Sequence, residues 1–303
     1  MSPPTRPGAP APQRPPEQAR ADENFPVALR VLPTATRRHL QALYGYARYV
    51  DDLGDEPLPA PGRGTADGPS PCHATGVDRI SALDAFEAEL RDLYAGHPVH
   101  HPVLHALAAT AHDCDLPLDP LLRLIEANRV DQHVTRYATF DQLVAYCTLS
   151  ADPVGELVLH LFGQASPVRV ALSDRICTAL QIIEHLQDIA EDQRRGRVYL
   201  PKADMDRFGV TEDDLSRTVA SPPLRNVIAF SAERAGAWLE SGAPLVSTLR
   251  GWGHLAVSGY LAGGRAALAT LARRRYDPLS CPTKPPRRTV LAQWLKATAR
   301  SAG

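Results

Sequence analysis

The helical spacing of apolar residues constrains this chain more than any other feature. Leu40, Leu43, Tyr44, Ala47 and Val50 follow steps of three and four, the pattern of an amphipathic helix. The same spacing continues through residues 80–93, 121–125, 143–161, 168–190, 224–235 and 255–271. Alternating apolar and polar runs closed by Asn-Gly or Asp-Gly turns, which would indicate β-hairpins, are missing from the sequence. The chain is therefore predicted to be all-α.

Charge and composition exclude several classes of protein. The 303 residues include 33 Lys and Arg against 34 Asp and Glu, so the net charge of -1 provides no positive field to attract nucleic acid. With 44% hydrophobic residues the chain can bury a large core. It contains no uninterrupted apolar run of about 18 residues that would span a bilayer. We therefore expect a soluble protein that does not bind nucleic acid.

The cysteines lie far apart, are odd in number and form no Cys-x-x-Cys pair. This distribution argues against both a disulfide framework and a zinc site. We interpret Cys72, Cys114, Cys147, Cys177 and Cys281 as reduced thiols, which predicts a cytoplasmic protein.

Proline-rich breaks divide the chain. Residues 1–21 contain seven prolines and few large apolar side chains, which predicts a disordered leader. A flexible loop is expected at 57–76, and residues 277–303 are expected to form a basic Pro-rich linker and a short C-terminal helix. Residues 22–276 are predicted to form one all-α domain. The C-terminal segment could make a peripheral membrane contact, and a simple exposed helix fits it equally well.

Two carboxylates continue the apolar stripe of the first helical segment. Steps of three and four from Leu40 reach Tyr44, Ala47, Asp51 and Asp55, so these side chains are predicted to point inward. Like charges one turn apart at the C-terminal end of a helix oppose the helix dipole and add no helical stability. This favours a site for a hard cation over a solvated helix end.

A second acidic stripe lies between residues 181 and 192. Gln181, Glu184, Asp188 and Asp192 recur at steps of three and four beside an apolar face, and no Lys or Arg follows before Arg194. A solvated helical face usually mixes in such basic partners. One continuous helix is therefore predicted to carry a packing face and a face for chemistry.

Two acidic helices that face each other would hold Mg2+, a hard cation that prefers carboxylate oxygens and recruits phosphate oxygens from its ligand. The pattern thus predicts a diphosphate substrate. Arg48 lies one turn before Asp51 and can pair with phosphate oxygens, and Tyr44 adds a hydroxyl on the same face. Arg and Tyr in such places are also common structural residues, and this alternative stays open.

Three motifs, in order along the chain, resemble those of the squalene and phytoene synthase family. They are Tyr44-x-x-x-Arg48-x-x-Asp51-Asp52-x-x-Asp55, Tyr146-Cys147-x-x-x-Ala151-x-x-Val154-Gly155, and residues 181–192 followed by Gly196-Arg197-x-Tyr199-Leu200-Pro201. The resemblance covers about residues 22–276. It implies a single-domain helical bundle of the isoprenoid synthase type with a central active-site cavity.

Within this family, residues 23–28 and 150–155 resemble the hydroxysqualene synthase branch of bacterial hopanoid pathways. That resemblance implies conversion of presqualene diphosphate to hydroxysqualene with release of diphosphate. It also implies two pathway partners, a presqualene diphosphate synthase and an oxidoreductase that forms squalene. The sequence contains no Gly-x-Gly-x-x-Gly turn for a nicotinamide cofactor, which argues weakly against a built-in reduction step.

The resemblance also implies roles for individual residues. Mg2+ would be bound by Asp51, Asp55, Glu184, Asp188 and Asp192, of which the four aspartates are the catalytic set. The substrate would be contacted by Tyr44, Arg48, Gln181, Tyr260, Asn24, Phe25 and Gln187.

Three positions depart from the family pattern. Glu184 stands where many members have Asn, Gln187 where phytoene synthases usually have Arg, and Asp152 where Asn is usual in this branch. The first two change the charge of the predicted metal and phosphate site, and the third affects a local contact.

Other functions fit part of the same pattern. Phytoene synthase and presqualene diphosphate synthase remain as enzymatic alternatives within the family. Chain-elongating prenyl diphosphate synthases are less favoured, because they repeat a double-Asp motif that the second half of this chain replaces with residues 188–192. A non-catalytic scaffold relative would be expected to lose the acidic motifs, which are intact here.

Overall fold

The computed structural model describes residues 32–55 and 76–280. The predicted leader 1–21, the loop 57–76 apart from Gly76, the C-terminal helix and the predicted substrate contacts Asn24 and Phe25 lie outside these residues. The division into one domain with these flanking segments stays a prediction.

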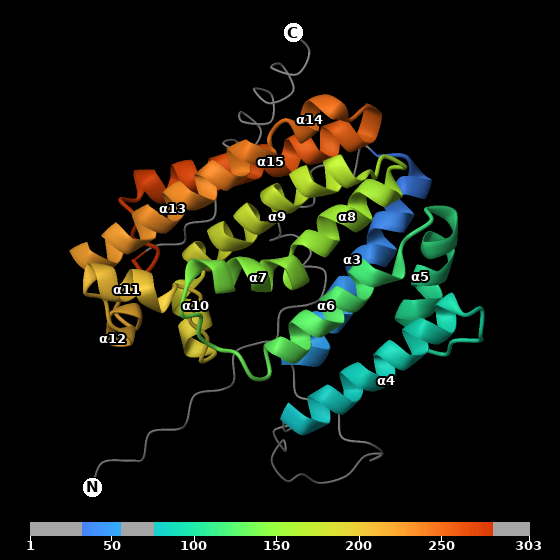
Figure 1. Cartoon of the computed structure of the whole chain (residues 1–303), viewed down its shortest axis with the longest axis horizontal. Coiled ribbons are helices and arrows are strands. Elements are labelled where there is room, and N and C mark those ends of the chain that lie inside the picture. Colours follow the sequence, from blue (N-terminus) through green and yellow to red (C-terminus); the bar gives the residue numbers. More distant parts are fainter. Residues whose placement is uncertain (1–31, 56–75, 281–303) are drawn as a thin grey trace, which may run out of the picture.

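The described residues form a bundle of α-helices (Figure 1). In chain order they are α3 (Thr34–Asp55), α4 (Gly76–Tyr94), α5 (Pro102–Asp113), α6 (Leu118–Val130), α7 (Phe140–Ser150), α8 (Asp152–Leu161), α9 (Pro167–Gln187), α10 (Ile189–Arg194), α11 (Lys202–Phe208), α12 (Glu212–Leu215), α13 (Pro222–Gly242), α14 (Leu245–Thr248) and α15 (Gly251–Arg273). No β-strand occurs in these two ranges, where one isolated bridge joins Arg136 to Val198. The all-α prediction is confirmed.

Serine and proline fix the starts of two long helices. Ser166 accepts a hydrogen bond from the backbone N–H of Arg169 at the start of α9, and Ser221 accepts one from Leu224 at the start of α13. Each serine is followed by a proline. A serine cap and a proline in the first turn both favour a helix start, because they satisfy or remove backbone donors that lack a helical partner.

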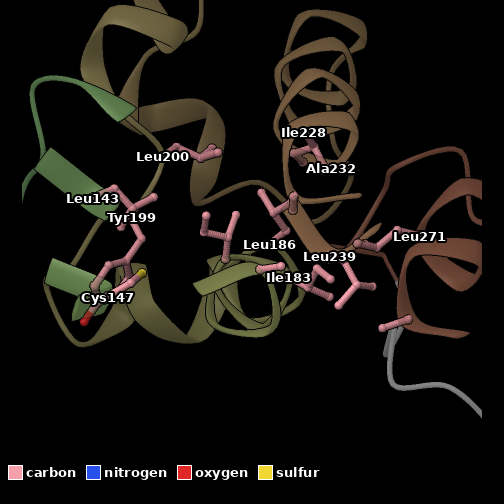
Figure 2. Packing of buried hydrophobic residues seen from close by; sticks show 14 of the residues in the cluster. Leu143, Cys147, Ile183, Leu186, Tyr199, Leu200, Ile228, Ala232, Leu239 and Leu271 are labelled. Carbon is pink, nitrogen blue, oxygen red and sulfur yellow. The ribbon is translucent and has the colours of Figure 1, made fainter. Parts of the chain in front are cut away.

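Helix α9 occupies the middle of the bundle. It packs against α13 and α15 on one side and against α7 and α8 on the other (Figure 1). The core around it includes Ile183 and Leu186 from α9 with Ile228 and Leu239 from α13 (Figure 2). A second core is centred on α3, α4, α5 and α6 and includes Tyr46. Because α8 contributes to both cores, it fixes α3 relative to α9.

The buried stripe of α3 differs from the predicted one. Tyr46, Val50 and Leu53 are buried, and the Tyr46 hydroxyl donates a hydrogen bond to a backbone carbonyl of α6 at 2.9 Å. Asp51 and Asp55 lie beside this stripe, and solvent reaches both side chains. The buried stripe is therefore shifted by about one residue around the helix from the predicted one, because Tyr46 fills the core, while the Asp51 carboxylate still contacts Asn128 of α6.

The second acidic segment is not one continuous helix. Helix α9 ends at Gln187, and Asp188 adopts φ -106° and ψ 17° before α10 begins at Ile189. The carbonyl of Asp188 still accepts hydrogen bonds from the N–H groups of Glu191 and Asp192, each at 2.9 Å. The prediction of a single helix through Asp192 is therefore wrong, and Asp192 belongs to a separate short helix.

Helix α15 is the one helix of the described residues that is long and apolar enough to cross a membrane, with a mean hydropathy of 1.2 over its most apolar window. In this structure 61% of that window is buried inside the protein. Its Arg265 forms an ion pair with Glu240 of α13 at 2.6 Å. These contacts are those of a core helix in the bundle.

Gly242 provides a test of the packing between α13 and α9. A Cβ atom at Gly242 would lie 2.7 Å from the carbonyl oxygen of Leu172. We expect Gly242→Ala to lower the stability by about 1–3 kcal/mol, because backbone atoms must move apart. Calorimetry should show a clear fall in the melting temperature.

The matched control is Gly236→Ala on the same helix. A Cβ atom there would meet only a side-chain carbon of Leu268, at 3.5 Å. Alanine favours a helix over glycine by about 1 kcal/mol, so the melting temperature should be unchanged or higher. Similar melting temperatures for the two variants would contradict the close packing at Gly242.

Candidate active site

The C-terminal end of α3 lies beside the segment that follows α10. One oxygen of the Asp55 carboxylate accepts a hydrogen bond from Arg197 at 2.7 Å, and the other lies 3.5 Å from a guanidinium nitrogen of Arg195. These arginines directly follow the second acidic segment in the sequence. The contact therefore brings the ends of the two acidic segments together, although 142 residues separate Asp55 from Arg197.

Asp51 is accessible to solvent although protein atoms surround its carboxylate on most sides. Its carboxylate accepts a hydrogen bond from the side-chain amide of Asn128 at 3.3 Å. Burial raises the pKa of Asp51 to about 7, while the Asn128 hydrogen bond and the charge of Arg48 lower it. Sequence reasoning missed Asn128, since a single Asn within an apolar helix forms no recognisable motif.

Arg48 and Tyr44 lie on the accessible side of α3. The guanidinium of Arg48 pairs with Asp52 at 2.9 Å, and half of its side-chain surface is exposed (50%). Tyr44 is half-buried. An exposed ion pair of this kind is weak, so it leaves Arg48 able to turn toward an anion. The predicted contact with phosphate stays a prediction.

His185 connects α9 to α10. One ring nitrogen lies 3.1 Å from the amide nitrogen of Gln181, and the other lies 3.5 Å from a carboxylate oxygen of Asp192. The ring stacks on Tyr199 with a centroid distance of 3.5 Å and an interplanar angle of 12°. His185 thus bridges two of the predicted site residues. Sequence reasoning missed this role, because the break at Asp188 had to be known first.

Asp131, which caps the C-terminal end of α6, is a second residue that sequence reasoning missed. One carboxylate oxygen accepts a hydrogen bond from the Tyr146 hydroxyl at 2.8 Å, and the other is buried without a hydrogen-bond partner. Burial raises the pKa of Asp131 to about 6, and the charge of Arg197 acts in the opposite direction. A carboxylate at a helix C-terminus, unfavourable to the helix dipole, was the available signal.

The other predicted residues are distributed along α9 and α15. Glu184 is exposed, and Gln187 and Asp188 are half-buried at the end of α9. Tyr260 of α15 packs against the core of α3 and α8. Burial raises the pKa of Tyr260, and the neighbouring Cys177 on α9 adds to this effect. Tyr260 therefore lies near Cys177, about one turn of α9 further from the helix break at Asp188 than Gln181 is.

The chemistry of the site fits a hard divalent cation. Within residues 32–55 and 76–280 no three His, Cys, Asp or Glu side chains are already gathered as a metal site. The donors present are carboxylate oxygens, which Mg2+ prefers. One of them, on the proposed ligand Asp192, is buried without a hydrogen-bond partner. Buried acceptors without a donor gain from a bound cation, so the residues fit Mg2+.

A surface hollow of about 660 Å3 lies away from these residues, between α11, α13 and α15. Its walls include Phe208, Phe230 and Tyr276, and none of the predicted site residues. A small recess touches His185 and Tyr199. The central cavity implied by the sequence resemblance stays a prediction.

Solved structures define the class of protein to which this fold belongs. The chain resembles the squalene synthase HpnC from Alicyclobacillus acidocaldarius at 39% identity and a TM-score of 0.73, covering 86% of this chain and 92% of that one. It also shares the fold of a dehydrosqualene synthase, with a TM-score of 0.79 at 21% identity over 94% of this chain and 93% of that one. The bundle is thus an all-α fold of the squalene synthase type.

Sequence comparison identifies the family. Residues 18–294 match the squalene/phytoene synthase family, and the chain belongs to it. It is 32% identical to a hydroxysqualene synthase of Zymomonas mobilis over 262 residues, which cover 86% of this chain and 81% of the relative. It is also 32% identical to a phytoene synthase of Mycobacterium tuberculosis over 232 residues, 76% of this chain and 70% of the relative.

Asp152, which stands where Asn is usual in the branch that the sequence resembles, has a structural consequence. Asp152 is buried at the start of α8, where the Thr178 hydroxyl donates a hydrogen bond to it at 2.8 Å. Burial raises the pKa of Asp152 to about 7, although the Thr178 hydrogen bond lowers it. The folded state therefore favours the protonated carboxyl. The stability that protonated Asp152 contributes is lost as the pH rises from about 4 toward 7.

We expect Asp152→Asn to stabilise the protein more at pH 8 than at pH 5. The amide keeps an acceptor for Thr178 and has no charge to desolvate, so the gain should grow by about 2–3 kcal/mol between these pH values. Melting temperatures of both proteins at both pH values provide the measurement. A difference between variant and parent that does not change with pH would contradict the raised pKa.

Proposed function

We propose that this protein is a Mg2+-dependent enzyme that converts presqualene diphosphate to hydroxysqualene and releases diphosphate. One observation carries the proposal: Asp55 contacts Arg197 and Arg195, so the aspartate-rich end of α3 adjoins the second acidic segment. Two acidic segments side by side suit a diphosphate that is bound through metal ions. The relatives named hydroxysqualene synthases, from Zymomonas mobilis and Rhodopseudomonas palustris, support this choice at 32% identity each.

The proposed ligands of Mg2+ are Asp51, Asp55, Glu184, Asp188 and Asp192. When bound, the metal supplies Lewis-acid stabilisation of the negative charge on the departing diphosphate. Asp51 is suited to this role, because the neutral amide of Asn128 rather than an arginine contacts its carboxylate. A bound cation would then provide positive charge that favours the ionised form of Asp51.

The chain's own polar groups would orient the leaving group. Arg48 and Tyr44 on α3 and Gln181 on α9 are proposed to donate hydrogen bonds to the diphosphate oxygens. Tyr260 of α15 would complete this set. Asn24, Phe25 and Gln187 are proposed as further contacts with the substrate. Fixed donors of this kind hold the breaking bond in one orientation, which lowers the entropic part of the barrier.

The proposed reaction balances without a reductant. The carbon–oxygen bond to the diphosphate breaks, and its electron pair leaves with the diphosphate. The resulting carbocation rearranges, water adds its oxygen to one carbon, and a proton is released to give the alcohol. Apolar walls protect such a cation from early capture by water.

This chemistry assigns a place in squalene and hopanoid biosynthesis. A presqualene diphosphate synthase must supply the substrate, and an oxidoreductase must remove the hydroxyl to give squalene. We propose a cytoplasmic enzyme, with a peripheral contact at the inner face of the membrane through the basic C-terminal segment. That segment lies beyond the part of the chain that the structure describes.

A second reaction within the family has specific support. The phytoene synthase of Mycobacterium tuberculosis is 32% identical to this chain, the same value as for the hydroxysqualene synthases. Phytoene synthase and presqualene diphosphate synthase would join two prenyl diphosphates head to head instead of adding water.

Product analysis separates these reactions. With presqualene diphosphate and Mg2+ but without NADPH, we expect mass spectrometry to detect hydroxysqualene and an equal amount of diphosphate. Parallel incubations contain farnesyl or geranylgeranyl diphosphate. Phytoene or presqualene diphosphate as the main product of those incubations would replace the proposed reaction, as would squalene formed only with NADPH.

Substitution of the proposed metal ligands provides a second test. Asp51→Ala and Asp188→Ala should each abolish turnover while circular dichroism stays unchanged, because each removes a ligand and no core volume. Asp206→Ala, which removes an exposed carboxylate paired with Lys202, is the matched control and should keep full activity. Wild-type product yield from either ligand variant at saturating Mg2+ would refute the assignment.

A further inference from the structure

Asp55 is a proposed metal ligand, and both of its carboxylate oxygens already face a cationic side chain. Arg197 donates a hydrogen bond of 2.7 Å to one oxygen, and Arg195 lies 3.5 Å from the other. Only 16% of the Arg197 side chain is exposed, compared with 56% for Arg195. Solvent therefore screens the pair with Arg197 less, and Arg197 is the stronger partner.

A carboxylate oxygen that accepts a short hydrogen bond from a guanidinium cannot also coordinate Mg2+ without strong repulsion between the two cations. Mg2+ binding at Asp55 thus requires the guanidinium of Arg197 to move. Moving a largely buried charge is costly unless another anion accepts it.

Asp131 provides such an anion. One of its carboxylate oxygens is bonded to the Tyr146 hydroxyl, and the other is buried and accepts no hydrogen bond. Arg197 and Asp55 both lie close enough to affect the charge state of Asp131. The unpaired oxygen of Asp131 can accept a hydrogen bond from Arg197 once that guanidinium leaves Asp55, because a buried acceptor gains stability when it receives a donor.

We propose that Arg197 is a positioning residue that acts as the resident counter-ion of Asp55 and moves to Asp131 when a divalent metal binds Asp55. The proposal rests on the proposed function only in taking Asp55 as a metal ligand. Arg197 then sets the metal affinity of the substrate-free protein, because each metal ion must displace it. The exchange keeps the guanidinium paired with a carboxylate in both states, so no buried charge is left alone.

Metal affinity is the direct test and needs no prenyl substrate. Mn2+ can replace Mg2+ in oxygen-rich sites, and the resonance of free Mn2+ in electron paramagnetic resonance gives its dissociation constant. The full chain is titrated at pH 8. Arg197→Gln removes the competing cation and should lower the dissociation constant about fivefold or more. Arg195→Gln, which removes a longer and more exposed pair, should change it by less than about twofold.

Arg265→Gln is the matched control, because Arg265 of α15 pairs with Glu240 of α13 and neither residue belongs to the proposed site. Its metal affinity should equal that of the parent protein. An unchanged or weaker affinity in Arg197→Gln would overturn the proposal, since Arg197 would then not compete for Asp55.

A double-mutant cycle tests the role of Asp131. Asp131→Asn keeps an acceptor for Tyr146 but offers Arg197 no charge, so it should weaken metal binding about threefold in the parent protein. In the Arg197→Gln background the same substitution should have a smaller effect, because the guanidinium that Asp131 would accept is missing. Equal weakening in both backgrounds would mean that Asp131 acts on the metal directly, and it would overturn the exchange.

A milder variant covers the case in which Arg197→Gln does not fold. Lysine at this position makes a point contact instead of a planar fork and is a weaker partner for a carboxylate. Arg197→Lys should therefore bind Mn2+ about twofold more tightly than the parent, and an equal or weaker affinity would overturn the proposal. Loss of the proposed reaction in the product assay would leave these affinities unaffected, so the two proposals fail separately.

Discussion

The structure depends on the close packing of α9 between its neighbours. At Gly242 a Cβ atom would meet the carbonyl oxygen of Leu172, and at Gly155 a Cβ atom would meet the side chains of Ser173 and Cys177. Both glycines thus allow a helix to approach α9 at neighbouring turns, α13 from one side and α8 from the other. This double contact fixes the rotation of α9 about its axis, and with it the direction of the side chains at its C-terminal end.

Electrostatics shape the site as much as packing does. Asp51, Asp55 and Asp131 lie near one another at the ends of α3 and α6. Carboxylates at helix C-termini are disfavoured by the helix dipole, and burial adds to this cost at Asp51 and Asp131. The protein compensates in three ways: a neutral amide at Asp51, an arginine at Asp55 and a tyrosine hydroxyl at Asp131. This partial compensation supports the proposed cation site.

The sequence predicted the helices well because apolar spacing is a local property. Long segments such as α9 and α13 carry their own periodicity and their own caps. The rotation of α3 could not be predicted in the same way, since both Tyr44 and Tyr46 fit an apolar stripe and only the contact with α6 selects Tyr46. The break at Asp188 was missed for a related reason, because the spacing of Gln181, Glu184 and Asp188 continues into α10 without interruption.

The missed site residues share one physical feature. Asn128, Asp131 and His185 act through contacts with residues far away in the sequence or across a helix break, so no spacing rule reveals them. The predicted carboxylates, in contrast, recur at helical steps. Local repetition therefore identified the acidic side chains, and tertiary structure was needed for the groups that tune them.

The two positions where a carboxylate replaces the Asn of the family pattern show how burial decides the effect of a charge. Asp152 is 4% exposed and receives a hydrogen bond from Thr178, so burial favours its neutral form. Glu184 is exposed at the end of α9, where water hydrates its charge. The same change of residue type thus gives a buried carboxyl that is shifted toward its neutral form at Asp152 and an exposed carboxyl close to the acidic segments at Glu184. Arg195 and Arg197, which pair with Asp55, bring positive charge to the same region. The balance between Glu184 and these arginines is therefore a property of this chain that the family motif alone does not determine.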